Sequence, residues 1–402
     1  MASAQPPATT IFADRLRAVL LGVRGALTEA LLDAGTSPDD PQDIAKRLGL
    51  HRNLAWKVSR VATEREVFLT LDHLPGTPGC ASIVAAIDRC ARRPASVARL
   101  REALKQFDDF VDEQAGDRPT LQLMLIELLP RHAARERQEL ARRAAYDGNR
   151  AVWGVQMRLR CATTIVAPSA GGDTVDVGFL GGAFGLAPLR STITMPVFRM
   201  AHVQDDGKPA PQQPRAIVDP PPADGGMPIL RDFCSANLPP MTVLQREGAT
   251  VYQVPLDRLG SPHEVDCVSA TITREAHPLH ASPENPEARH VIGCMSPAEM
   301  FMWDMLVART LPFELPPITG LASALPGTNH NEPTGLPLYE DLERLGSPPT
   351  IATPLWARYP EAVGFVLDRL GWNLGDFVGF RLTIPVPPMP ARFTLRYPLA
   401  PR

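Results

Sequence analysis

Long hydrophobic runs are absent from the 402-residue sequence, and none approaches the roughly 20 apolar residues that span a bilayer. The first apolar stretch, around residues 19–21, lies among arginines and does not resemble the core of a secretory signal peptide. The six cysteines form no C-x-x-C pair, a pattern typical of reduced thiols and not of a disulfide framework. We therefore expect a cytoplasmic protein without a membrane partner.

Lysine is also rare: only four of the 41 basic residues are lysines. The formal net charge is small, at -3. A value near neutrality averages over unlike domains, so it neither indicates nor excludes a nucleic-acid partner. The local balance is more informative: between Gln42 and Arg60 five basic side chains accompany one acid, Asp43. With 44% hydrophobic residues the chain can bury a sizeable core, and its length of 402 residues is enough for two or three folded domains.

The first 150 residues show the periodicity of helices. Apolar side chains recur at helical spacing over 11–32, and a Gly-Thr-Ser-Pro break follows at 35–38. Further helical patterns are predicted at 40–61, 63–73, 80–91, 95–114, 119–128 and 131–150. This half of the chain is therefore predicted to be all-helical.

Near Trp153 the period changes to two, as expected for half-buried strands. Strands are predicted at 155–161, 175–180, 192–198, 250–254, 265–273, 376–384 and 392–397. Two helices are expected among them, one from the capping box Ser296-Pro297-Ala298-Glu299 and one over 361–370, and 204–227 is expected to be an exposed loop. The predicted fold class is α+β, an all-helical N-terminal half followed by a mixed β-rich domain, divided as 1–78, 79–150 and 151–402.

Residues 41–60 have the pattern of two helices joined by a sharp turn. Asp40 is suited to cap the first helix, with Pro41 at its first position. Gly49 supplies the positive φ that ends this helix, and Ala45 is small where the second helix crosses. The apolar plug between the helices is expected to consist of Ile44, Leu48, Leu50 and Val58.

This segment resembles the helix-turn-helix of bacterial transcriptional regulators in the winged-helix superfamily, nearest to the MarR-like and IclR-like branches. The resemblance covers about residues 20–60 and implies a second helix, about 51–61, that reads the major groove of double-stranded DNA. The DNA-contacting residues that it implies are Lys46, His51, Arg52, Asn53, Trp56, Lys57 and Arg60.

The chain departs from that family at three points. Ala55 replaces the usual branched aliphatic residue in the middle of the second helix, and Trp56 is unusual on a face that meets DNA. A wing is not evident, because 64–73 is compatible with a helix as well as with a hairpin. Two helices joined by a glycine turn also occur in ordinary bundles, so a structural or protein-binding use is the alternative to DNA reading.

A regulator of this kind is expected to act as a homodimer, and the helix at 11–32 and those after 80 are the candidate dimer surfaces. Residues 151–402 are expected to sense a small-molecule effector or a partner, or to oligomerise, an expectation that rests on analogy alone.

The alternative function class is an enzyme in the C-terminal half. His277 and His280, with Glu275 and His290 nearby, are the best metal candidates, although Pro278 prevents the helix that would align the first two rings. The glycine-rich run 178–185 lacks a nucleotide-loop pattern and is expected to be a tight β-turn, and 329–332 is a polar loop. No G-x-S-x-G motif occurs. We assign no catalytic residue, metal or cofactor from the sequence.

Overall fold

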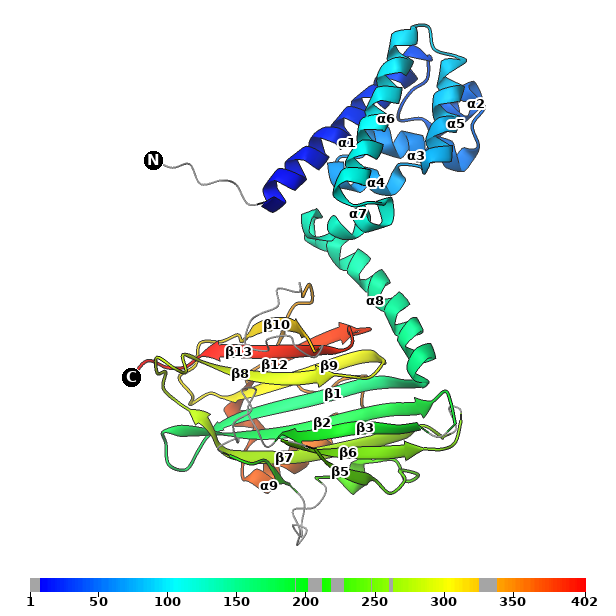
Figure 1. Cartoon of the computed structure of the whole chain (residues 1–402). Coiled ribbons are helices and arrows are strands. Elements are labelled where there is room, and N and C mark those ends of the chain that lie inside the picture. Colours follow the sequence, from blue (N-terminus) through cyan, green and yellow to red (C-terminus); the bar gives the residue numbers. More distant parts are fainter. Residues whose placement is uncertain are drawn as a thin grey trace. The chain divides into compact units, whose positions relative to one another are not determined.

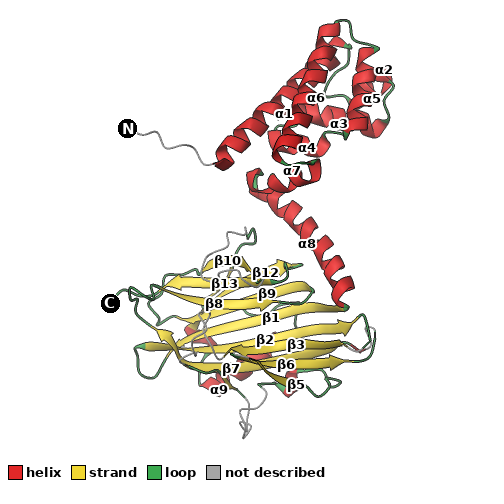
Figure 2. Cartoon of the chain, in the orientation of Figure 1, coloured by secondary structure: helices red, strands yellow, loops and turns green. Residues whose placement is uncertain are grey.

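The computed structural model of the protein shows helices followed by strands, which confirms the predicted α+β class (Figure 2). It describes residues 8–191, 193–201, 212–217, 228–246, 248–259, 263–324 and 338–402. The chain divides into two compact units, Met1–Gln138 and Glu139–Arg402, whose elements are labelled in Figure 1. We call them the helical unit and the β unit. The domain limits predicted from the sequence, after residues 78 and 150, stay predictions.

Most helices lie where periodicity predicted them, with small shifts at their ends, but the helix predicted over 63–73 is present only as a 3-10 turn and a short α-helix over 67–73. Their bounds are α1 Ala8–Asp33, α2 Pro41–Leu48, α3 Arg52–Thr63, α4 Thr70–His73, α5 Thr77–Asp88, α6 Pro94–Gln114, α7 Arg118–Met124 and α8 Arg131–Trp153, with short 3-10 turns η1 Val67–Leu69 and η2 Ile126–Leu128. Helix α8 begins in the helical unit, and its residues from Glu139 onward belong to the β unit.

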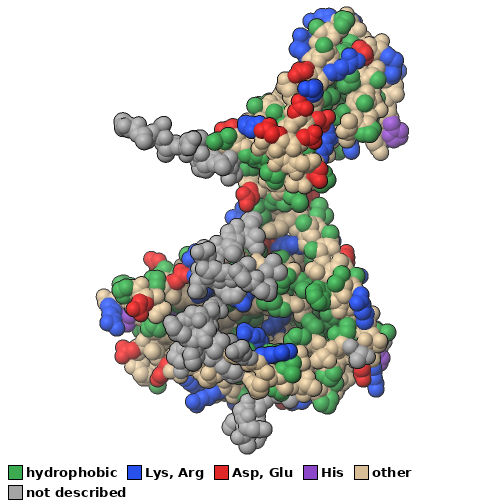
Figure 3. All heavy atoms as spheres, in the orientation of Figure 1, with side chains coloured by type: hydrophobic (Ala, Val, Ile, Leu, Met, Phe, Trp, Pro, Cys, Tyr) green, Lys and Arg blue, Asp and Glu red, His purple; other side chains and the backbone are tan. Residues whose placement is uncertain are grey.

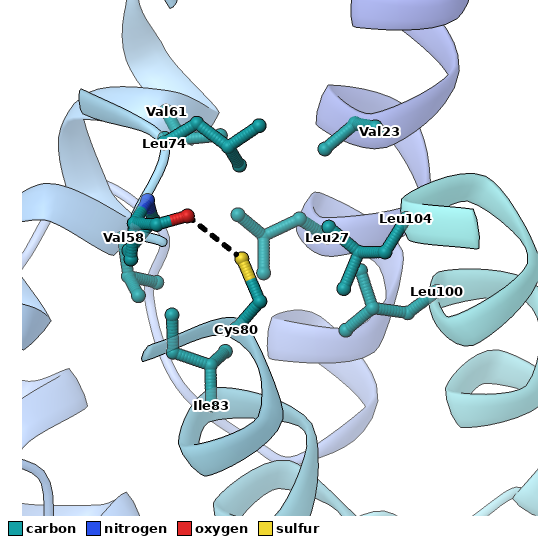
Figure 4. Close-up of a pocket in the computed structure, with 10 residues that line it drawn as sticks. Val23, Leu27, Val58, Val61, Leu74, Cys80, Ile83, Leu100 and Leu104 are labelled. Carbon is teal, nitrogen blue, oxygen red and sulfur yellow. Dashed lines mark hydrogen bonds between the residues drawn. The ribbon is translucent and has the colours of Figure 1, made fainter. Parts of the chain in front are cut away.

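The core of the helical unit is closely packed. The inward stripe of α1, which includes Leu16, Leu20 and Val23, is fully buried, as is Phe107 of α6. Figure 4 shows a void of about 10 Å³ in this core, lined by side chains of α1, α3, α5, α6 and the segment before α5. A void of this size holds at most one water molecule, so the centre of this unit is a core and not a ligand pocket.

The β unit is built on a seven-stranded sheet with the order β11-β12-β9-β1-β2-β7-β4, and two three-stranded sheets, β10-β13-β8 and β3-β6-β5, accompany it. Strand β1 pairs in parallel with β9 and antiparallel with β2. The bounds are β1 Val155–Pro168, β2 Thr174–Pro188, β3 Ile193–Ala201, β4 Arg215–Ala216, β5 Thr242–Arg246, β6 Ala249–Leu256, β7 Val265–Pro278, β8 Glu287–Cys294, β9 Ala298–Ala308, β10 Ile318–Ser323, β11 Glu343–Gly346, β12 Phe377–Pro385, β13 Ala391–Pro398 and helix α9 Tyr359–Leu370, with 3-10 turns η3 Arg231–Phe233 and η5 Leu374–Asp376.

A buried polar network fixes α9 on the large sheet. The Arg381 guanidinium donates two hydrogen bonds of 2.7 Å to the Asp304 carboxylate, which also accepts one from the Tyr359 hydroxyl at 2.8 Å. The Tyr359 hydroxyl lies 2.7 Å from Thr163 Oγ1 of β1. Burial raises the pKa of Asp304, and the adjacent Arg381 guanidinium opposes that shift. A buried charge in this setting is tolerated only because it is paired and fully hydrogen-bonded.

The helix predicted from the capping box at 296–299 is wrong, because strand β9 begins at Ala298. This strand pairs with β1 on one side and β12 on the other, and most of its residues are buried. A strand buried on both faces lacks the alternation of polar and apolar residues, and so its sequence resembles that of a buried helix.

The tight turn predicted at 178–185 is also wrong, since this run lies inside β2. Gly185 in this run lies at an irregularity of the strand. The register with β7 shifts between Ala183 and Leu186, and Gly185 has a φ of +60°. An irregularity of this kind is a β-bulge, where a glycine takes a backbone conformation that other residues avoid.

The other predicted strands overlap observed ones, and the helix predicted at 361–370 lies within α9. Most of the loop predicted at 204–227, and all of 329–332, lie outside the described residues. The described part of that loop, 212–217, includes the short strand β4, so the loop prediction is wrong there. In the described part of the chain, no helix is both long and apolar enough to cross a membrane.

Candidate nucleic-acid interface

The turn between α2 and α3 has the predicted construction. Asp40 caps α2, because its carboxylate accepts hydrogen bonds from the backbone of Gln42 at 2.8 Å and Asp43 at 3.1 Å. Gly49 follows the helix with a φ of 65° and a ψ of 31°, in the left-handed region. The Leu50 amide then donates to the Ala45 carbonyl at 3.1 Å. The glycine turn therefore stops α2 and redirects the chain into α3 within a few residues.

The apolar plug also lies where the sequence predicted it. Ile44 and Val58 are fully buried, Leu48 is nearly so, and Leu50 is half-buried. Ala55, the departure from the family pattern, is fully buried as well. Because α3 presents small and branched apolar side chains inward, its remaining side chains point away from the core.

The outward face of α3 carries five of the predicted DNA-contacting residues. Arg52, Asn53, Trp56, Lys57 and Arg60 are all exposed, and their spacing of one, three or four residues places them on one side of the helix.

The remaining two predicted residues lie just outside this face. His51 is exposed but serves as the N-cap of α3, with its ring Nδ1 accepting from the Asn53 amide at 3.3 Å. Lys46 is exposed on α2.

The basic side chains on these two helices differ in their availability to a ligand. Arg60 pairs with Glu64 at 2.7 Å, and Arg47 pairs with Asp43 at 2.8 Å. Within the described ranges, Lys46, Arg52 and Lys57 take part in no ion pair. These three cations are therefore the ones that can bind an anion without first breaking an internal contact.

Trp56 is held by the helix that follows α3. Its ring packs edge-on against His73 of α4, with centroids 5.3 Å apart and an interplanar angle of 84°, while 46% of the residue stays exposed. Burial, and secondarily the nearby Arg60 charge, lower the pKa of His73. His73 is therefore neutral at neutral pH and acts as a packing partner for Trp56.

Residues 64–73, which sequence left open between helix and hairpin, contain η1 and α4. The described residues 8–153 contain no strand, so a two-stranded wing has no place in that range.

The sequence analysis did not identify Glu64 as part of this region. Its carboxylate accepts a hydrogen bond from Arg60 and lies 3.8 Å from His73 Nε2. The spacing of four residues between Arg60 and Glu64 was the available signal.

Charge on the molecular surface is mixed beyond these helices. On the face shown in Figure 3, both basic and acidic side chains are visible over the helical unit.

The histidines singled out as metal candidates separate into two places. His277 and His290 lie together, with ring centroids 5.8 Å apart, whereas His280 contacts the Pro401 carbonyl at 3.1 Å. The amide of Glu275 donates to Asp176, and this residue has a φ of +50°. Among the residues that the structure describes, no group of three or more His, Cys, Asp or Glu side chains is placed to hold a metal ion.

The chain matches no protein-family model and no curated protein sequence. The solved structures similar to it include an M1 zinc metallopeptidase from Deinococcus radiodurans, at 9% identity and a TM-score of 0.23. A variant of that peptidase bound to a Tyr-Ser-Ala substrate gives 10% identity and a TM-score of 0.24. Each likeness covers 60% of this chain and 42% of the peptidase chain. A likeness this low carries no argument about fold or activity.

Proposed function

We propose that the protein is a sequence-specific DNA-binding transcriptional regulator that inserts α3 into the major groove of double-stranded DNA. The observation that carries the proposal is the outward face of α3: a stripe of polar and basic side chains on a helix whose inner face is locked against α2. A helix fits the major groove, and its exposed side chains then reach base edges and phosphates.

The residues of this face divide by chemistry and position. Arg52 and Asn53 lie in the first turn of α3, the end of a recognition helix that meets the bases, and their side chains suit bidentate contacts to guanine and adenine. Lys57 lies one turn further along and suits a phosphate. Arg60 is less available, because contact with DNA competes with its ion pair to Glu64.

We further propose a homodimer, because two recognition helices about one duplex turn apart bind a palindromic site more tightly than one. The sensing of an effector or partner by the β unit stays a prediction of the sequence.

The test is selection of genomic DNA fragments by the purified full-length protein, followed by binding assays on the recovered site. We expect the Arg52→Ala/Lys57→Ala double variant to lose selective binding. The matched control is Arg101→Ala/Lys105→Ala, which removes the same charge from α6, where both side chains are exposed and paired with aspartates.

Loss of binding in the first variant, with retention in the second, supports the proposal. Equal binding by both variants and the unaltered chain, or no selection of DNA by the unaltered chain, contradicts it.

A further inference from the structure

The β unit contains a cluster of two imidazoles and one phenol that the proposed function does not use. The Tyr397 hydroxyl lies 3.2 Å from His277 Nε2 and 3.1 Å from His290 Nε2. Tyr397 is fully buried, both histidines are half-buried, and the Phe313 ring packs on Tyr397 with centroids 4.6 Å apart. Three possible ligand atoms from three strands, β7, β8 and β13, thus lie at one site.

Strand register places these side chains together. In the β8–β13 pair, His290 lies opposite Leu395 and Tyr397 lies opposite Ala288, so His290 and Tyr397 are diagonal neighbours on one face. His277 comes from β7, near the end of its pairing with β2. The cluster therefore joins an edge of the large sheet to the β10-β13-β8 sheet.

The hydrogen bonds define the protonation of each ring. His277 Nδ1 lies 2.9 Å from the Pro278 carbonyl, which can only accept, so Nδ1 carries the proton and Nε2 has a free lone pair. The Tyr397 hydroxyl therefore donates to His277 and accepts from His290 Nε2. Burial lowers the pKa of both histidines, that of His290 to about 3, so both rings are neutral at neutral pH.

We propose that His277, His290 and Tyr397 bind one divalent transition-metal ion of the zinc and copper class, with water completing its coordination. Imidazole suits these ions, and tetrahedral ligands at about 2.0–2.1 Å from zinc stand about 3.3 Å apart. The two nitrogen-to-oxygen distances of 3.2 and 3.1 Å are close to that separation. Metal binding would replace the two shared hydrogen bonds by three bonds to the ion.

A second feature of the cluster supports a metal. Histidine ligands commonly donate their other ring N–H to a carbonyl or carboxylate, which fixes ring orientation, and the His277–Pro278 contact has this form. On binding, Tyr397 loses its proton to solvent and the His290 proton moves from Nε2 to Nδ1. One of the ion's two positive charges is then neutralised by the phenolate, and the cation stabilises the ionised form of Tyr397.

The experiment uses full-length, metal-stripped protein without a polyhistidine tag. Zn²⁺ is titrated and bound ion per chain is measured by equilibrium dialysis, while the ultraviolet difference spectrum reports ionised tyrosine. Titration with Cu²⁺ adds a visible phenolate-to-copper band. We expect one ion per chain, a tyrosinate signal that saturates with it, and the copper band.

Three variants test the ligands. His277→Asn and His290→Asn are expected to weaken binding by more than about tenfold, since loss of an outer-shell partner alone costs that much. Tyr397→Phe keeps the ring that packs on Phe313 and removes the oxygen, so it loses the tyrosinate signal and the copper band even where some ion still binds.

The matched control is His280→Asn, because this histidine is three residues from His277 but contacts Pro401 instead. Near-ultraviolet circular dichroism checks the fold of each variant. Absence of stoichiometric binding by the unaltered protein, or equal binding by all four variants, would overturn the proposal. The outcome is independent of DNA binding by the helical unit.

Discussion

Replacement of Gly49 by alanine tests whether the glycine turn determines the α2–α3 arrangement. A Cβ added at Gly49 meets no atom within 4 Å, so the substitution causes no clash and its cost is purely conformational. A side-chain-bearing residue in the left-handed region costs roughly 1–2 kcal/mol, and the stiffer unfolded chain returns roughly 0.4–1 kcal/mol. The net expectation is a loss of about 1 kcal/mol in the stability of the helical unit.

Gly25 in the middle of α1 provides the opposite control. A Cβ there also meets nothing within 4 Å, but the backbone is helical, so Gly25→Ala is expected to stabilise by about 0.5–1 kcal/mol.

Amide hydrogen exchange resolved by mass spectrometry follows the helical unit within the full chain. The most protected amides of α2 and α3 should exchange about fivefold faster in Gly49→Ala and more slowly in Gly25→Ala. Protection that rises or stays unchanged in Gly49→Ala would refute the role assigned to the turn.

Three further predictions concern contacts that stabilise the two units. Asp40→Ala, which removes the α2 cap, should cost about 1 kcal/mol in the free energy of unfolding, and Asp40→Asn should retain most of it; urea denaturation measures both. The Arg93 guanidinium and backbone lower the pKa of Asp33 from 3.8 to about 2, so this contact stabilises the fold above pH 4 and is lost as the pH falls toward 2. Acid titration of stability should therefore be flatter in Asp33→Asn across that range. Arg381→Met leaves Asp304 as an unpaired buried charge and should cost about 3–5 kcal/mol, whereas the double variant Asp304→Asn/Arg381→Met should recover part of that loss in thermal unfolding.

Sequence patterns predicted the helical unit well because its signals are local. A cap at Asp40, a glycine at position 49 and apolar residues at helical spacing each act within one or two turns, and the structure has all of them in place. The β unit was less predictable where burial on both faces erased the alternation, as in β9. Whether such a segment forms a strand depends on pairing partners far away in the sequence, and local periodicity does not reveal those partners.

The candidate sites show the same division. The outward face of α3 follows from helical spacing once its inner face is known. The contact of Trp56 with His73 depends on how α4 packs, which the sequence does not state. The cluster of His277, His290 and Tyr397 depends on strand register, and the phenol, which lies 107 residues beyond His290, was therefore not a candidate before the fold was known.

The salt dependence of DNA binding tests the central claim most directly. On a site recovered from genomic DNA, the slope of log affinity against log salt should be steep for the unaltered protein. It should fall by about 1 in Lys57→Ala, because one phosphate contact is lost. Binding that is indifferent to salt, or a slope unchanged by Lys57→Ala and by Arg52→Ala, would show that the outward face of α3 does not meet DNA.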